Sequence, residues 1–424
     1  MLTISQIREN REDIIERLRI KDFNANNIID KVLEADENRR KTQKNQDSKQ
    51  AELNALSREI GMLIKDKNEK QAQVIREKTL KLKEEIKELN LGFSRAQADL
   101  LELLIQIPNI PHKSVPGGKG PENNEIIRSG GEIPEFKFSA LAHWDLAKKY
   151  NIIDFELGNK ITGTGFPVFK GKGARLQRAL INFFLNENEN AGYLEFLPPL
   201  LVNEESGFGT GQLPDKEGLM YHIPSDNYYL IPTAEVPVTN IYRDVIINSD
   251  DLPVKNTSYT PCFRREAGSY GKDVRGLNRV HQFDKVEIVQ IQHPEKSYET
   301  LEEMVNHVET LVIKLELPYR IVRLCGGDMG LSSALTYDFE VFAAAQEKWL
   351  EVSSVSNFES YQANRLRLRI RERGSKHTIL AHTLNGSALA LPRIVAALLE
   401  NNQSEKGIRI PPVLMKYTGF EYIT

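Results

Sequence analysis

The chain has 424 residues, more than one hydrophobic core usually organises, so its length favours two domains. Its 40% hydrophobic and 27% charged residues describe an ordinary globular protein, and a net charge of -3 gives no overall basic signal for nucleic acid. Two cysteines exclude a disulfide framework and favour a reducing compartment. With no signal-peptide core and no apolar run of the roughly 20 residues that span a bilayer, the sequence predicts a cytoplasmic protein.

Residues 1–107 contain no proline and only two glycines, which favours long helices. One apolar stripe follows i, i+4 and i+7 positions from Leu82, and another begins at Ile29 and resumes at Leu53. The stripes predict two long antiparallel helices, each on the order of 50 Å long, with a turn near residues 65–70. Because so narrow a seam cannot build a globular core, we expect the hairpin to project into solvent. Spacing alone leaves open a dimerising coiled coil or a ligand-binding arm.

A segment rich in proline and glycine, residues 108–125, is the predicted linker to a second domain at 126–424. In that domain short β-rich runs alternate with helical runs. Residues 259–266 and 279–290 are predicted strands joined by a loop that contains glycine, which indicates an antiparallel pair. The second domain is therefore predicted to be α+β, with a mainly antiparallel sheet flanked by helices.

The predicted strand pair carries charged and aromatic side chains that suit a nucleotide. Side chains alternate along a strand, so Arg264 shares a face with Glu266, and Arg279 shares one with Phe283 and Glu287. Guanidinium groups match phosphate oxygens, an aromatic ring stacks on a base, and a carboxylate holds an amino group or an ammonium. The alternative to a nucleotide site is a row of surface ion pairs that includes one aromatic ring without a binding role.

Other clusters point in the same direction. Thr233 and Glu235 are expected on one face, and the segment 351–354 combines a carboxylate with hydroxyls, a possible Mg²⁺ site if phosphates complete the shell. Each alone is more often an ordinary strand end. Residues 385–393 are predicted to form a strand, a turn and a helix start, which places Arg393 at a helix N-terminus that favours anions.

Several rival motifs are absent from the sequence. There is no phosphate-binding P-loop, and Gly163-Thr164-Gly165 lacks the third glycine of a dinucleotide fingerprint. No serine is framed as a nucleophile elbow, and no cysteine and histidine spacing predicts a structural zinc site.

Taken together, these segments resemble class II aminoacyl-tRNA synthetases, and specifically the seryl-tRNA synthetases. Residues 192–201 resemble motif 1, with Pro199 at a dimer interface, while 263–266 resemble motif 2 and 386–393 resemble motif 3. The seryl assignment depends on the helical hairpin and on three segments, which are 233–235, 275–283 and 351–357.

The resemblance implies roles for individual residues. Arg264 would be the catalytic ligand of the α-phosphate and Arg393 that of the γ-phosphate, while Phe283 would stack on adenine. The implied ATP-binding residues are Arg264, Arg265, Glu266, Val280, Phe283, Glu351, Val352, Ser353, Ser354 and Arg393. Glu351 and Ser354 would hold Mg²⁺, and serine would be bound by Thr233, Ala234, Glu235, Glu287 and Ser387, with Glu287 on the ammonium.

The implied reaction is ATP-dependent activation of L-serine to seryl-adenylate, followed by transfer of serine to the 3'-terminal adenosine of serine tRNA, and by resemblance also of selenocysteine tRNA. The implied enzyme is a homodimer whose hairpin grips the tRNA. The loop 267–276, with Lys272 and Arg275, is a hypothetical guide for the acceptor end. Two rivals are a paralogue that charges a carrier protein and a non-enzymatic coiled-coil scaffold.

Three features depart from the family pattern or strain it. Ala388 stands where motif 3 often has glycine, which slightly narrows the approach of the backbone to ATP. Strict alternation would pair Glu351 with Ser353, so a metal role for Ser354 requires a bulge or a strand end. Arg265 fills a variable position and receives no individual role.

Overall fold

The computed structural model describes residues 1–266 and 275–424, which form two units that are described separately below. The first unit comprises Met1–Arg19 and Phe23–Pro108, and the second comprises Ile20–Asp22 and Asn109–Thr424. Composition gave no sign that Ile20–Asp22 belongs to the second unit.

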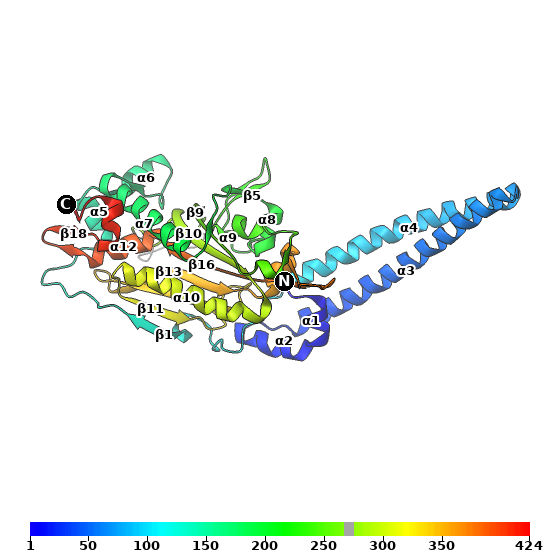
Figure 1. The fold of residues 1–424 in the computed structure, drawn as a ribbon, viewed down its shortest axis with the longest axis horizontal. Helices are drawn as coiled ribbons and strands as arrows, with labels where there is room; N and C mark the ends of the chain where they lie inside the picture. Colours follow the sequence, from blue (N-terminus) through cyan, green and yellow to red (C-terminus); the bar gives the residue numbers. More distant parts are fainter. Residues whose placement is uncertain (267–274) are drawn as a thin grey trace. The chain divides into compact units, whose positions relative to one another are not determined.

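The first unit is built from helices. Its elements are α1 (Ile4–Glu9), α2 (Arg11–Leu18), α3 (Asn26–Lys65) and α4 (Glu69–Leu104). Thr3 begins α1 through a capping box, in which its hydroxyl accepts the Gln6 N–H at 3.2 Å. The two long helices α3 and α4 run side by side (Figure 1). The predicted helical hairpin and the position of its turn are therefore confirmed.

The seam between α3 and α4 is apolar in part and polar in part. Leu53, Leu82 and Ile86 form a small buried cluster. In the segment that lacks apolar side chains, Gln46 Nε2 donates to Asn90 Oδ1 at 2.7 Å, and Lys49 pairs with Glu85 at 2.9 Å. Exposed ion pairs contribute at most about 1 kcal/mol, so the hairpin depends mainly on its apolar seam.

The second unit is organised around an eight-stranded sheet in the order β1-β11-β12-β13-β16-β10-β9-β4. Neighbouring strands are antiparallel except for β4 and β9. This confirms the predicted α+β class. The strands are β1 (Glu125–Gly130), β4 (Leu194–Glu195), β9 (Val254–Phe263), β10 (Gln282–Gln292), β11 (Tyr319–Arg323), β12 (Leu335–Ala343), β13 (Lys348–Asn357) and β16 (His382–Ala390).

Within residues 1–266 and 275–424, helices and four small sheets accompany this central sheet. The helices are α5 (His143–Lys149), α6 (Phe155–Ile161), α7 (Gly171–Asn190), α8 (Glu204–Thr210), α9 (Glu235–Asn240), α10 (Ser297–Lys314), α11 (Ser360–Leu366), α12 (Leu391–Asn401) and α13 (Pro412–Thr418). The small sheets contain β2 (Ile153–Asp154), β3 (Val168–Phe169), β5 (Leu201–Asn203), β6 (His222–Ile223), β7 (Tyr228–Leu230), β8 (Ile246–Asn248), β14 (Arg369–Arg371), β15 (Thr378–Leu380), β17 (Gln403–Ser404), β18 (Gly407–Arg409) and β19 (Tyr422–Ile423). No helix in the described ranges is both long and apolar enough to cross a membrane.

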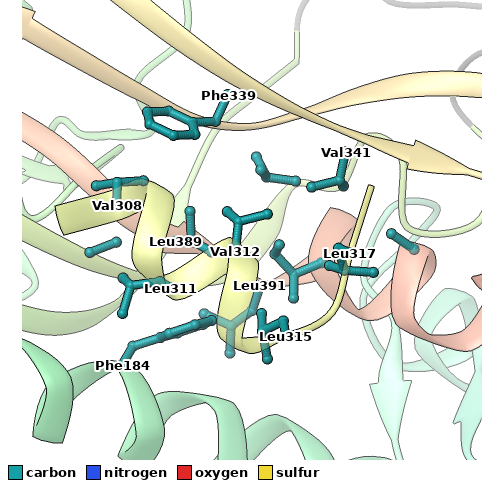
Figure 2. Packing of buried hydrophobic residues seen from close by; sticks show 14 of the residues in the cluster. Phe184, Val308, Leu311, Val312, Leu315, Leu317, Phe339, Val341, Leu389 and Leu391 are labelled. Atoms are coloured by element: carbon teal, nitrogen blue, oxygen red, sulfur yellow. The ribbon is translucent and has the colours of Figure 1, made fainter. Parts of the chain in front are cut away.

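The main core lies between the sheet and its helices. Figure 2 shows Val308, Leu311 and Val312 of α10 packed with Phe339 and Val341 of β12. Their spacing on α10 is the i, i+3, i+4 pattern of one helix face, and all of them are buried. Burial of each such side chain contributes about 1.5 to 3 kcal/mol, so this layer holds the strands that carry the site in fixed positions.

Candidate active site

Strands β9 and β10 form the predicted antiparallel pair, with Phe283 opposite Cys262 and Glu287 opposite Ser258. Strand β9 ends before residue 264, and β10 begins only at residue 282, so Arg264 and Glu266 follow β9 and Arg279 precedes β10. The alternation argument was therefore wrong for these three residues, although it holds for Phe283 and Glu287. Arg279 and Glu266 nevertheless meet outside the strands, where Arg279 Nη1 donates to Glu266 Oε2 at 3.1 Å.

A cavity of about 560 Å³ lies over these strands. This volume falls within the usual range for small-molecule sites. Two predicted residues do not line the cavity, namely the fully buried Ala234 and the exposed Arg265. The predicted residues that do line it are Thr233, Glu235, Arg264, Glu266, Val280, Phe283, Glu287, Glu351, Val352, Ser353, Ser354, Ser387 and Arg393.

One end of the cavity is a buried polar network around Glu287, which is 2% exposed. Glu287 pairs with Lys285, and Thr233 Oγ1 donates to Glu287 Oε2 at 3.3 Å. Lys285 Nζ also donates to Thr233 Oγ1 at 2.7 Å. Lys285 was missed in the sequence, although its position two residues before Glu287 places both on one strand face.

Glu235 belongs to the same end of the cavity. It is the first residue of α9, and its N–H donates to Thr233 Oγ1 at 3.2 Å, so this segment is a helix start rather than the strand end considered from sequence. Gln362 Nε2 donates to Glu235 Oε1 at 2.7 Å. Burial and the nearby Glu287 carboxylate raise the pKa of Glu235 to about 7.

Strand β13 contains the bulge that a shared role for Glu351 and Ser354 requires. Phe339 pairs with Ser353 but Glu340 pairs with Glu351, so one extra residue, Val352, is inserted between them. The bulge brings Glu351 and Ser354 to the same cavity.

The oxygen atoms at this bulge fit a hard cation such as Mg²⁺. Asp338 lies opposite Ser354, and its Oδ1 is buried without a hydrogen-bond partner in the described part of the chain. Burial and the nearby Glu351 raise the pKa of Asp338 well above its usual range. Among described residues no group of three or more His, Cys, Asp or Glu side chains could hold a metal alone. A cation here would therefore need further oxygen ligands, such as phosphate.

The last predicted segment joins β16 directly to α12, without the turn expected from sequence. Ser387 lies opposite Glu287 in the sheet. Arg393 lies in the first turn of α12, as predicted, and donates to the backbone oxygens of Asn278 at 3.0 Å and Glu351 at 2.8 Å. Asn385 was missed in the sequence; its Nδ2 is buried without a partner among the residues described.

At the other end of the cavity Arg264 lies beside Phe283. The guanidinium carbon is 5.2 Å from the centre of the ring, and Arg264 Nε donates to Pro232 O at 3.3 Å. A ring and two arginines near a metal-compatible carboxylate can hold a nucleotide, while buried carboxylates beside Lys285 can hold a zwitterion.

An antiparallel sheet with this site is the core of a class II aminoacyl-tRNA synthetase. Residues 221–402 match the family model described as the tRNA synthetase class II core domain (G, H, P, S and T). Residues 1–111 match the model of the seryl-tRNA synthetase N-terminal domain. The chain belongs to the seryl-tRNA synthetase family, as its curated relatives also show.

Curated relatives named serine--tRNA ligase include those of Salinibacter ruber and Chlorobaculum parvum. That of Salinibacter ruber is 50% identical over 424 residues, which is 100% of this chain and 99% of the relative. That of Chlorobaculum parvum is 45% identical over 427 residues and covers 100% of both chains. Among solved structures, the seryl-tRNA synthetase of Pyrococcus horikoshii complexed with ATP has a TM-score of 0.87 at 34% identity, covering 100% of this chain and 99% of its own.

Proposed function

We propose that the chain activates L-serine with ATP and then transfers serine to the 3'-terminal adenosine of serine tRNA. The observation that carries this proposal is one cavity with a guanidinium-and-ring end for a nucleotide and a buried carboxylate end for an amino acid. The names of the relatives and the ATP complex of the Pyrococcus enzyme support it.

At the nucleotide end, Phe283 stacks on adenine, with Glu266 and Val280 beside the base. Arg264 binds the α-phosphate, and Arg393 binds the γ-phosphate from the first turn of α12. Both arginines line the cavity, and both are held by hydrogen bonds to backbone oxygens. Because they are already oriented, they counter charge that develops on the phosphates with little rearrangement.

Mg²⁺ is proposed at Glu351 and Ser354, where it would neutralise phosphate charge when bound. The carboxylate and hydroxyl oxygens gathered by the bulge support this assignment. Val352 and Ser353 line the same wall of the cavity.

At the amino-acid end, Glu287 binds the serine ammonium, and Ser387 faces the side-chain hydroxyl. Glu235 adds a second buried carboxylate. The serine carboxylate attacks the α-phosphorus, the bond to pyrophosphate breaks, and pyrophosphate leaves. This step needs no protein nucleophile, because positioning and charge stabilisation supply the acceleration.

For tRNA, we propose that the α3–α4 hairpin grips the body of serine tRNA and that the segment ending at Gly276 guides the acceptor end. The Arg275 guanidinium lies 4.6 Å from the centre of the Trp144 ring, beside a second cavity of about 1020 Å³. Lys272, the other cation predicted for this role, lies outside the described residues. Normal charging by an Arg275→Ala, Lys272→Ala double variant would exclude this role.

We further propose a homodimer formed through the motif 1 segment around Pro199. Leu194, in β4, is 63% exposed, and Leu197, just after β4, is 83% exposed; β4 is the last strand of the central sheet. Exposed leucines beside a sheet edge are typical of a surface that pairs with a partner. Sedimentation of the full chain should show a dimer, and Leu197→Glu should shift it toward the monomer.

The overall proposal is tested by ATP–pyrophosphate exchange across the amino acids, followed by charging of total tRNA. Exchange with serine and charging of serine tRNA are expected. Serine-dependent exchange without charging would instead indicate a ligase for a carrier protein, and neither activity would indicate a scaffold.

A further inference from the structure

Lys285 is a buried cation at the amino-acid end of the cavity. It is 5% exposed, pairs with Glu287 and donates to Thr233 Oγ1 at 2.7 Å. A lysine is rarely buried to this extent unless its charge has a specific partner.

The hydrogen bonds of Thr233 show which groups remain for a substrate. A hydroxyl has one hydrogen to donate and two lone pairs. Thr233 Oγ1 donates its hydrogen to Glu287 Oε2 and accepts from Lys285 Nζ and from the Glu235 N–H. The hydrogen and both lone pairs of the Thr233 hydroxyl are therefore engaged within the protein, and the hydroxyl orients this network.

The same accounting leaves two groups free for an incoming ligand. Glu287 Oε2 is shared by Lys285 and Thr233, while Glu287 Oε1 accepts no hydrogen bond from any described residue. Lys285 has three N–H groups; it is ion-paired with Glu287, and among described residues one N–H is donated in a hydrogen bond, to Thr233 Oγ1. One carboxylate oxygen and at least one ammonium hydrogen therefore remain, which is the complement of a zwitterion.

The order of residues along β10 indicates where the remaining N–H of Lys285 acts. Phe283, Lys285 and Glu287 follow one another on one face at steps of about 6.6 Å. Lys285 thus stands between the proposed adenine position and the proposed ammonium position, where the amino-acid carboxylate must meet the α-phosphate. Without Lys285, the carboxylates of Glu235 and Glu287 would repel that carboxylate.

We propose that Lys285 binds the carboxylate of the substrate serine and holds it for attack on the α-phosphorus. This inference rests on the proposed activation of serine. In this assignment Glu287 binds the ammonium of serine, Lys285 binds its carboxylate, and Ser387 faces its hydroxyl.

The test compares two ligands that differ only at the carboxylate, L-serine and L-serinamide. Their equilibrium binding to the full chain is measured calorimetrically for the wild type and for Lys285→Met, an uncharged side chain of similar length. A charge-assisted hydrogen bond predicts that Lys285→Met weakens serine binding by about tenfold or more and changes serinamide binding much less. Glu287→Gln is the matched control, and it should weaken both ligands because both carry the ammonium.

Equal losses for serine and serinamide in Lys285→Met would overturn the proposal and leave Lys285 only the role of holding Glu287. If Lys285→Met does not fold, Lys285→Gln keeps a donor without the charge and gives the same comparison. Failure of the wild type to bind serine would instead remove the proposed function itself, so the two failures are distinguishable.

Discussion

The two ends of the cavity differ in how they are assembled. At the amino-acid end, the side chains of Glu287 and Lys285 are 2% and 7% exposed and already bonded to each other. At the nucleotide end, those of Arg279 and Glu351 are 46% and 50% exposed and stand at a loop and a bulge. The difference indicates a serine pocket whose charges are desolvated and already paired, and a nucleotide end where Arg279 and Glu351 stay hydrated until ATP arrives.

The largest effect is expected at the buried end. Glu287→Ala should lower serine-dependent pyrophosphate exchange by roughly 1000-fold or more, because it removes the ammonium ligand and leaves Lys285 charged without its partner. The unfolding midpoint of the variant separates lost binding from lost folding. Unchanged exchange would exclude Glu287 from the ammonium role.

A smaller effect, confined to ATP, is expected from Phe283→Leu. Losing one stacked ring costs about 1 to 3 kcal/mol, so the KM for ATP should rise roughly tenfold or more. The KM for serine should stay constant, because Phe283 lies outside the Glu287 network. Steady-state exchange with each substrate varied in turn measures both KM values. A rise in the serine KM alongside the ATP KM would argue against separate nucleotide and amino-acid ends of the cavity.

The pH dependence of serine binding should follow Glu235. Its folded pKa of about 7 lies above the ordinary value of 4.5, so the native state holds a proton between these values that the unfolded chain has lost. The free energy of unfolding should therefore fall as pH rises through this window.

Serine binding favours the charged form of the Glu235 carboxylate, so the serine KM should rise roughly tenfold per pH unit below pH 7. Glu235→Gln should remove that rise, and a profile unaffected by this variant would assign the titration to another group.

The smallest effect is expected at the bulge. Ser354→Ala removes one neutral hydroxyl, which contributes about 0.5 to 1.5 kcal/mol, so the Mg²⁺ concentration for half-maximal exchange should rise only a few-fold. Ser353→Ala is the matched control, since the Ser353 hydroxyl donates to Ser387 O instead. If Ser353→Ala raised the Mg²⁺ concentration for half-maximal exchange more than Ser354→Ala did, Ser354 would be excluded as a metal ligand.

Sequence patterns predicted the fold more completely than the site. The periodic stripes of α3 and α4 and the turn between them follow from local preferences, which are visible in composition. Phe283 and Glu287 were found because both lie within a regular strand.

The residues that sequence patterns placed wrongly or missed depend on irregular or long-range geometry. Arg264 and Arg279 lie beyond the strand ends, where alternation no longer applies. The bulge at Val352 was recognised only as a requirement, because its register depends on the neighbouring strand. Lys285 looked like one more strand lysine, and its burial arises from contacts with Thr233, which lies 52 residues away in the chain.

The most direct test of the two-ended cavity is equilibrium binding of serine and ATP, each measured alone, to Glu287→Gln and Phe283→Leu. We predict that Glu287→Gln weakens serine binding by at least tenfold with ATP binding nearly unchanged, and that Phe283→Leu does the reverse. Equal weakening of both ligands by either variant would contradict the account.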